Sequence, residues 1–268
     1  MSRIIKPMVL LHNLMGNYIG NIIWPTILFI AIFIPVFITY EPYIMTNAHY
    51  DISSSIIQTL NSTLGSPVSL ASTYLLGDLA PYLYLLIVAL LIAYRKEVHR
   101  IVNELGLSWR PLFGKLTIPI VLVLAVLWFL VSGLIPLTAI LPQVSLTNVL
   151  LLIYTLYPIA ISEELVFRGF ILNKLLPRRN STKPISIMHS IPAILISAIY
   201  FTAAHLPIYL AMYGVNDLLT VAYILSYIFI YGLISGFIFA LTSNVIPDII
   251  MHWINDYLSI MVIIYSIH

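Results

Sequence analysis

The chain has 268 residues, of which 61% are hydrophobic and 8% are charged, with a formal net charge of +2. A soluble domain carries roughly 25% charged residues, so the composition and the mean hydropathy of +1.03 exclude an ordinary soluble protein and indicate an integral membrane protein. The small net charge gives no reason to expect nucleic acid as a partner, and the absence of cysteine excludes disulfides, a thiol nucleophile and a cysteine metal site.

The apolar runs predict an all-α, polytopic transmembrane helical bundle. Each run approaches or exceeds the roughly 20 residues that a helix needs to cross a bilayer. We expect one transmembrane domain over 1–268, with N-terminal spans in 1–137 and motif-bearing spans in 146–268. The seven predicted spans are Ile22–Tyr40, Tyr74–Tyr94, Leu116–Leu137, Leu146–Leu176, Ile187–Leu206, Leu219–Thr242 and Pro247–Ile267.

The segments around these spans carry further expectations. Met1–Gly20 has no compact apolar block with a cleavage site, so we expect an interfacial lead-in that stays on the protein. Residues 41–73 are too polar to span, and Pro207 is expected to end the fifth span. An eighth, half-crossing segment within 41–73 or 207–218 stays open.

The basic residues predict the orientation. Eleven of the twelve Lys and Arg residues lie in three groups: Arg3 with Lys6, Arg95–Lys115, and Lys174–Lys183. With seven spans, all three groups face the same side, which is the cytoplasm by the positive-inside rule. The N-terminus is therefore expected inside and His268 outside. The same groups are suited to contact anionic lipid headgroups.

The segment Ile161–Gly169 places charged groups inside an apolar run. An ionisable side chain in the hydrocarbon costs about 2.5–3.5 kcal/mol on insertion scales, so it is retained mainly where it has a function. Glu164 and Arg168 are spaced i,i+4 with the acid first, which favours an ion pair on one helix. Glu163 is rotated about 100° from them, so it is the carboxylate left to polarise a water molecule.

Other polar side chains lie in the later spans. His205 is near the end of the fifth span and, taken alone, is more often a hydrogen-bonded bundle histidine than a catalytic one. His252, Asn255 and Asp256 share one narrow face of the seventh span. Together with a free glutamate they predict a wet pocket suited to hydrolysis, in which a carboxylate takes a proton from water and His and Asn donate to the oxyanion.

Some polar or small residues have a plainer interpretation. Asp78, His189 and Asp248 lie near span ends, where we expect solvated or helix-capping groups. Gly232 and Gly236 form a small-residue pair that predicts close helix packing in the sixth span.

Three motifs in order resemble one family. They are Glu-Glu-x-x-x-Arg at Glu163–Arg168, Phe-x-x-x-His at Phe201–His205, and Gly-x-x-x-Gly leading to His-x-x-Asn within Gly232–Asp256. This series resembles the CAAX prenyl protease 2 and bacteriocin-processing family of glutamate intramembrane proteases. The resemblance implies an intramembrane peptide hydrolase without a required cofactor, acting on a membrane-associated peptide or a prenylated protein.

The resemblance also implies residue roles. Glu163 would activate the nucleophilic water, with His205 helping to position that water. His252 and a nearby amide would form the oxyanion hole. The side chains implied to support the site are Glu164, Arg168 and Phe201.

The chain departs from the family pattern at one position. The family usually places an amide four residues after the third-motif histidine, where this chain has Asp256, while Asn255 comes one residue earlier. A carboxylate would repel an oxyanion unless it is protonated. Either Asn255 replaces the amide after a small helix rotation, or the site is altered.

The predicted depths of the two histidines also differ. His252 lies near the cytoplasmic end of its span, whereas His205 lies late in a span that enters from that side. We expect them to meet only if the fifth helix begins near Pro192, with Lys183–Ile191 at the interface.

Alternatives to the glutamate mechanism remain. Glu163, His205 and His252 could ligate zinc in a metal-dependent hydrolase, because two His and a carboxylate form a plausible zinc set. Because Asp256 stands at the amide position, a second alternative is a non-catalytic immunity or scaffold protein that retains the pocket. A proton-relay transporter is less favoured, since the chain lacks the repeat symmetry of such proteins.

Overall fold

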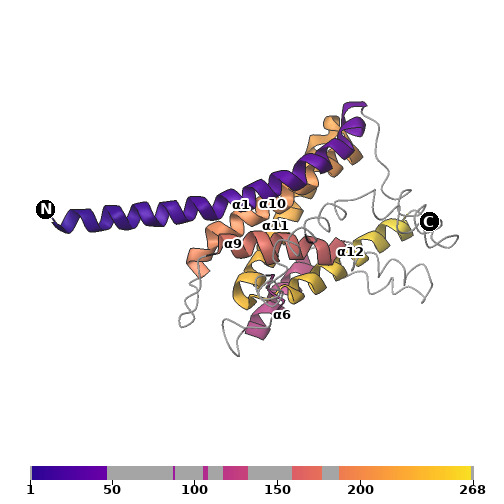
Figure 1. Ribbon diagram of the computed structural model, residues 1–268. Coiled ribbons are helices and arrows are strands. Elements are labelled where there is room, and N and C mark those ends of the chain that lie inside the picture. Colours follow the sequence, from indigo (N-terminus) through magenta and orange to yellow (C-terminus); the bar gives the residue numbers. More distant parts are fainter. Residues whose placement is uncertain are drawn as a thin grey trace.

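The computed structural model describes residues 2–46, 87, 105–107, 117–131, 159–176 and 187–266. Within these ranges every regular element is helical, which confirms the all-α prediction for the described part (Figure 1). The elements are α1 (Ser2–Thr46), α6 (Thr117–Val131), α8 (Ser162–Glu164), the π-helix η4 (Leu165–Leu172), α9 (Asn173–Leu175), α10 (Ile187–Tyr213), the 3-10 turn η5 (Val215–Asp217), α11 (Leu218–Thr242) and α12 (Ile246–Ser266).

Three described helices are long and apolar enough to cross a membrane. They cover Ile22–Thr46 in α1, Met188–Tyr213 in α10, and Val215–Thr242 in η5 and α11. These helices support an integral membrane protein. Apart from residue 87, the predicted span Tyr74–Tyr94 lies outside the described residues, as do the end of the third predicted span and the start of the fourth, so the count of seven spans stays a prediction.

The first helix is longer than expected. α1 runs without interruption from Ser2 to Thr46, so the predicted lead-in is helical and continuous with the first span, which also continues past Tyr40. Pro25 and Pro35 do not end it. In apolar surroundings an open helix end leaves several backbone groups unpaired, which costs more than the one hydrogen bond that a proline removes.

The prediction that Pro207 ends the fifth span is wrong. α10 contains both Pro192 and Pro207 and continues to Tyr213. The helix ends instead at Gly214, whose φ of 76° lies in the left-handed region. The Gly214 N–H donates to Leu210 O at 2.9 Å, which closes the final turn.

α10 and α11 pack closely, and the glycine pair on α11 is the reason. A Cβ added at Gly232 would lie 3.2 Å from Ala198 Cβ, and one at Gly236 would lie 2.8 Å from Ile194 Cγ2. The interpretation of this pair as a packing surface is confirmed. α1 runs beside α10 (Figure 1) and contacts it through Phe29, which stacks on Tyr200 with ring centroids 4.6 Å apart.

The charged motif lies on the short helical series α8, η4 and α9. The Asn173 N–H donates to Arg168 O, a five-residue spacing that defines the π-helical turn. Single π-helical segments occur often at functional sites. Gly169 lets the turn at 105–107 approach this series, because an added Cβ would lie 2.6 Å from Leu105 O. The motif is thereby enclosed by other parts of the chain.

Candidate active site

The first motif forms the predicted ion pair. Arg168 Nη1 lies 3.2 Å from Glu164 Oε1, and both side chains are buried. The Arg168 guanidinium also lies 4.1 Å from the centroid of the Phe201 ring. A planar cation over an aromatic face is favourable, and more so when it is desolvated. Phe201 therefore contacts the motif helix directly, as its predicted supporting position requires.

Glu164 is the most heavily hydrogen-bonded side chain of the site. Its Oε1 accepts a hydrogen bond from Tyr231 OH at 3.1 Å and lies 2.8 Å from His252 Nδ1. Its Oε2 lies 3.3 Å from Ser235 Oγ. Tyr231 and Ser235 were not predicted as site residues; their only signal in the sequence is an i,i+4 spacing beside the glycine pair on α11. These contacts surround the Glu164 carboxyl group with hydrogen-bonding groups of the protein.

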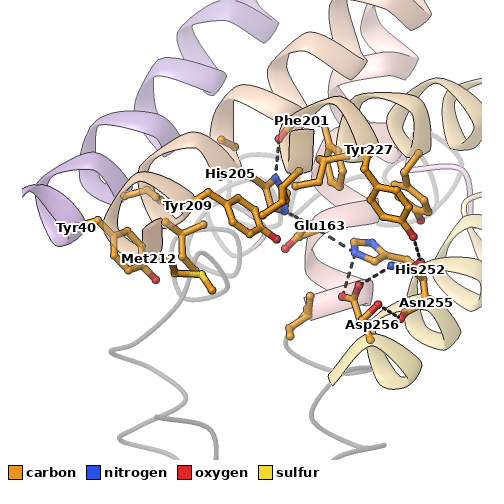
Figure 2. A pocket seen from close by; sticks show the side chains of 18 of the residues that line it. Tyr40, Glu163, Phe201, His205, Tyr209, Met212, Tyr227, His252, Asn255 and Asp256 are labelled. Atoms are coloured by element: carbon orange, nitrogen blue, oxygen red, sulfur yellow. Dashed lines mark hydrogen bonds and ion pairs between the residues drawn. The ribbon is translucent and has the colours of Figure 1, made fainter. Parts of the chain in front are cut away.

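Glu163 lines a cavity, where it faces two histidines (Figure 2). Its Oε2 lies 3.5 Å from His205 Nε2 and 3.9 Å from His252 Nε2. Among the described residues this buried oxygen has no hydrogen-bond partner. The two adjacent glutamates thus differ as helical geometry predicts: one is bound by protein donors, and the other is available to a ligand.

His205 has a defined tautomer. Its Nδ1 lies 2.8 Å from Phe201 O, and a carbonyl oxygen can only accept, so Nδ1 carries the proton. In the neutral ring Nε2 is then an acceptor that faces Glu163. Glu163 Oε2 and His205 Nε2, which lie 3.5 Å apart, can both accept a hydrogen bond from one water molecule. The lone pairs of that water are then directed away from both residues.

His252 lies between two carboxylates. Nδ1 contacts Glu164, and Nε2 lies 3.2 Å from Asp256 Oδ2. Both ring nitrogens can donate only when the imidazole carries two protons. The arrangement therefore fits an imidazolium whose Nε2–H is directed toward the cavity.

Asn255 is held by two residues, Trp128 and Tyr227, that were not predicted as part of the site. Its Oδ1 accepts hydrogen bonds from Trp128 Nε1 and Tyr227 OH, each at 3.1 Å. The Asn255 Nδ2 donates to Asp256 Oδ1 at 3.2 Å. Two donors on the oxygen determine which way the amide points. For Trp128, the only signal in the sequence was an indole within an apolar span.

These groups surround a cavity of about 380 Å³. Its polar end contains all five predicted catalytic side chains, and its other end is apolar and aromatic, with Tyr40, Tyr209 and Met212 on the side away from His252 (Figure 2). The lining residues are Val36, Tyr40, Ile159, Glu163, Phe201, Ala204, His205, Ile208, Tyr209, Met212, Tyr213, Ile224, Tyr227, Ile228, Tyr231, His252, Asn255, Asp256 and Ser259.

Two sequence-based expectations are wrong. His205 and His252 both reach Glu163 although α10 begins at Ile187, so a later start near Pro192 is not needed. Asp248 was expected to be solvated or capping, yet its side chain is fully buried and bonded to Ser235. It does lie in the first turn of α12, where it contacts Ser235 of α11.

His189 and Asp78 were also expected to be solvated or helix-capping groups. His189 is exposed, as expected for a solvated group, and Asp78 lies outside the described residues. In the part of the chain that the structure describes, no group of three His, Asp or Glu side chains is arranged to hold a metal ion.

Residues 144–258 match the protein-family model described as Type II CAAX prenyl endopeptidase Rce1-like. The matched region contains all three motifs and the described helices from α8 to most of α12. This match confirms the resemblance drawn from the motifs. No curated protein and no solved structure matched the chain.

Proposed function

We propose, from the match of residues 144–258 to the model of type II CAAX prenyl endopeptidases described as Rce1-like, that this protein is an intramembrane endopeptidase that uses a glutamate-activated water. The family is a protease family, which supports a peptide hydrolase. The observation that carries the finer proposal is the meeting of Glu163, His205 and His252 at one buried cavity, from three separate helical segments.

In the proposed reaction, a water molecule donates hydrogen bonds to Glu163 Oε2 and His205 Nε2. As its oxygen attacks the peptide carbonyl carbon, Glu163 takes one water proton. The carbonyl oxygen becomes an oxyanion, which the Nε2–H of His252 stabilises. When the tetrahedral intermediate breaks down, Glu163 returns the proton to the leaving amine, and a carboxylic acid and an amine are released.

The shape of the cavity supports a membrane-associated substrate. The cavity has a volume of about 380 Å³, and its apolar end is lined by side chains of α1, α10 and α11, such as Val36, Ile208 and Ile224. An apolar wall favours burial of a lipid chain or of apolar peptide side chains. A prenylated peptide is therefore the substrate to test first. We further propose that the cavity opens to the cytoplasm, from the distribution of basic residues along the chain.

The test is cleavage of a quenched, prenylated CAAX peptide by the purified full-length protein in detergent. The variants are Glu163→Gln, which keeps the side-chain volume, and Glu41→Gln, the same change at a partly exposed site on α1. We expect Glu163→Gln to lower kcat by at least about 10²-fold, and Glu41→Gln to behave as the unchanged protein. Full activity in Glu163→Gln would contradict the mechanism.

Adding a chelator to the cleavage assay distinguishes the glutamate mechanism from a metal-dependent hydrolase. Activity that persists after chelation supports the glutamate mechanism, whereas activity that is lost on chelation and restored by zinc supports the metal-dependent one. If no peptide is cleaved, a biological phenotype that survives Glu163→Gln favours the non-catalytic immunity or scaffold function.

A further inference from the structure

A second buried acid lies behind the site, and the proposed mechanism does not use it. Asp248 is fully buried near the start of α12. Its Oδ1 lies 3.0 Å from Ser235 Oγ, and the same Oγ lies 3.3 Å from Glu164 Oε2. One hydroxyl group thus connects two carboxyl groups.

The number of protons shared by Asp248, Ser235 and Glu164 determines which group donates in each hydrogen bond. A serine hydroxyl has one hydrogen, so it can donate to only one of the two carboxyl oxygens. The other contact is a hydrogen bond only if that carboxyl group is protonated and donates to Ser235 Oγ. One of the two acids must therefore be neutral for both contacts to be favourable.

The surroundings indicate which acid is neutral. Glu164 has Arg168 at 3.2 Å and His252 at 2.8 Å, so a negative charge on it is paired. Asp248 forms no ion pair among the described residues, since Arg168 and His252 act on it only from a greater distance, and its Oδ2 is buried without a hydrogen-bond partner. An unpaired buried carboxylate is costly, and the first turn of a helix compensates only a small part of that cost.

We propose that Asp248 is a neutral carboxylic acid that donates to Ser235, which in turn donates to Glu164 and so positions Glu164 for its contact with His252. This series of hydrogen bonds runs from Asp248 through Ser235 and Glu164 to the His252 imidazole ring, which faces the cavity. Asp248 is a positioning residue, since it does not line the cavity. Its effect on cleavage rests on the proposed function, but its protonation state does not.

The first test is infrared spectroscopy of the purified full-length protein. A neutral Asp248 gives the C=O stretching band of a protonated carboxyl group, and Asp248→Asn is expected to remove that band from the spectrum. A spectrum that loses no such band in Asp248→Asn would overturn the proposal. This measurement needs no substrate, so it remains decisive if the proposed protease function fails.

The second test compares two replacements of the same side chain by cleavage of the prenylated peptide. Asparagine can donate from its amide to Ser235, as the neutral acid does, so Asp248→Asn is expected to keep kcat within about threefold. Asp248→Leu cannot donate and is expected to lower kcat by at least about tenfold, the usual cost of losing a group that orients a reacting one. Equal losses in both variants would overturn the assignment of a neutral donor.

A third variant checks the connection itself. Ser235→Ala removes the bridging hydroxyl while it leaves Asp248 in place. Its loss of kcat should match that of Asp248→Leu, and the double variant should lose no more than either single one, because both changes break the same chain. If the loss of kcat in the double variant equalled the combined losses of the two single variants, the proposed hydrogen-bond series would be overturned.

Discussion

Asp256 Oδ2 lies 3.2 Å from His252 Nε2, one turn further along the same helix. This contact uses the hydrogen that the proposed mechanism directs to the oxyanion. It also puts a carboxylate at the position where the family that the motifs resemble usually has an amide. The site thus has a strong donor and, beside it, a group that competes for that donor.

The first prediction concerns this competition. In Asp256→Asn the repelling charge is gone and the amide oxygen can still accept from His252, while the NH2 group replaces the oxygen that accepts from Asn255 and, once that hydrogen bond is lost, can turn to donate to the oxyanion. We expect cleavage of the prenylated peptide to rise by about tenfold, less than the full effect of a new oxyanion donor. Asp256→Leu, which offers neither an acceptor nor a donor, is the control and should lose activity. A loss in Asp256→Asn as large as that in Asp256→Leu would show that the negative charge itself is required.

The second prediction concerns His205, which the Phe201 carbonyl orients through Nδ1. His205→Ala removes the second acceptor for the water, so kcat should fall by about 10²-fold with a smaller change in KM. His189→Ala is the matched control, because His189 is an exposed residue on the same helix. A change confined to KM would assign His205 to substrate binding instead.

The third prediction concerns the support of Asn255. Trp128→Phe keeps an aromatic ring but removes the Nε1 donor to Asn255 Oδ1, and Trp128 is completely buried. Loss of this hydrogen bond should lower the free energy of unfolding by about 1 kcal/mol and reduce cleavage, since the amide can then turn. Trp24→Phe, at a position that is 70% exposed, should change neither property. Thermal unfolding in detergent and the cleavage assay measure the two effects, and unchanged values for both would contradict this role.

The fourth prediction concerns the contact of α10 with α11. Gly236→Val should destabilise the protein by about 1–3 kcal/mol, because side-chain atoms would have to occupy the space of Ile194. Adding Ile194→Ala should recover part of that loss, so the double variant should be more stable than the sum of the single changes predicts. The control is Leu219→Val, at an 84% exposed position of α11. An unfolding temperature of Gly236→Val equal to that of the unchanged protein would show that the helices are not in close contact there.

Much of the site could be predicted because its chemistry is local in sequence. The acidic motif, the i,i+4 ion pair of Glu164 with Arg168 and the packing glycines of α11 each depend on spacing along a single helix. Helical geometry alone also separated Glu163 from Glu164, and the structure gives these two residues different surroundings as expected. The catalytic roles of the predicted side chains remain predictions.

The sequence by itself determined the membrane class, the helical architecture and the polar residues that needed an explanation, because an ionisable group in an apolar run is costly wherever the helix lies. Only the tertiary structure decided what each group contacts. The helix continues through Pro207, and Asp248 is buried and contacts Ser235. Trp128 holds Asn255 in place, while Tyr231 and Ser235 hold Glu164. These outcomes depend on how helices distant in the sequence are packed together, and no spacing along one helix specifies the partner on another.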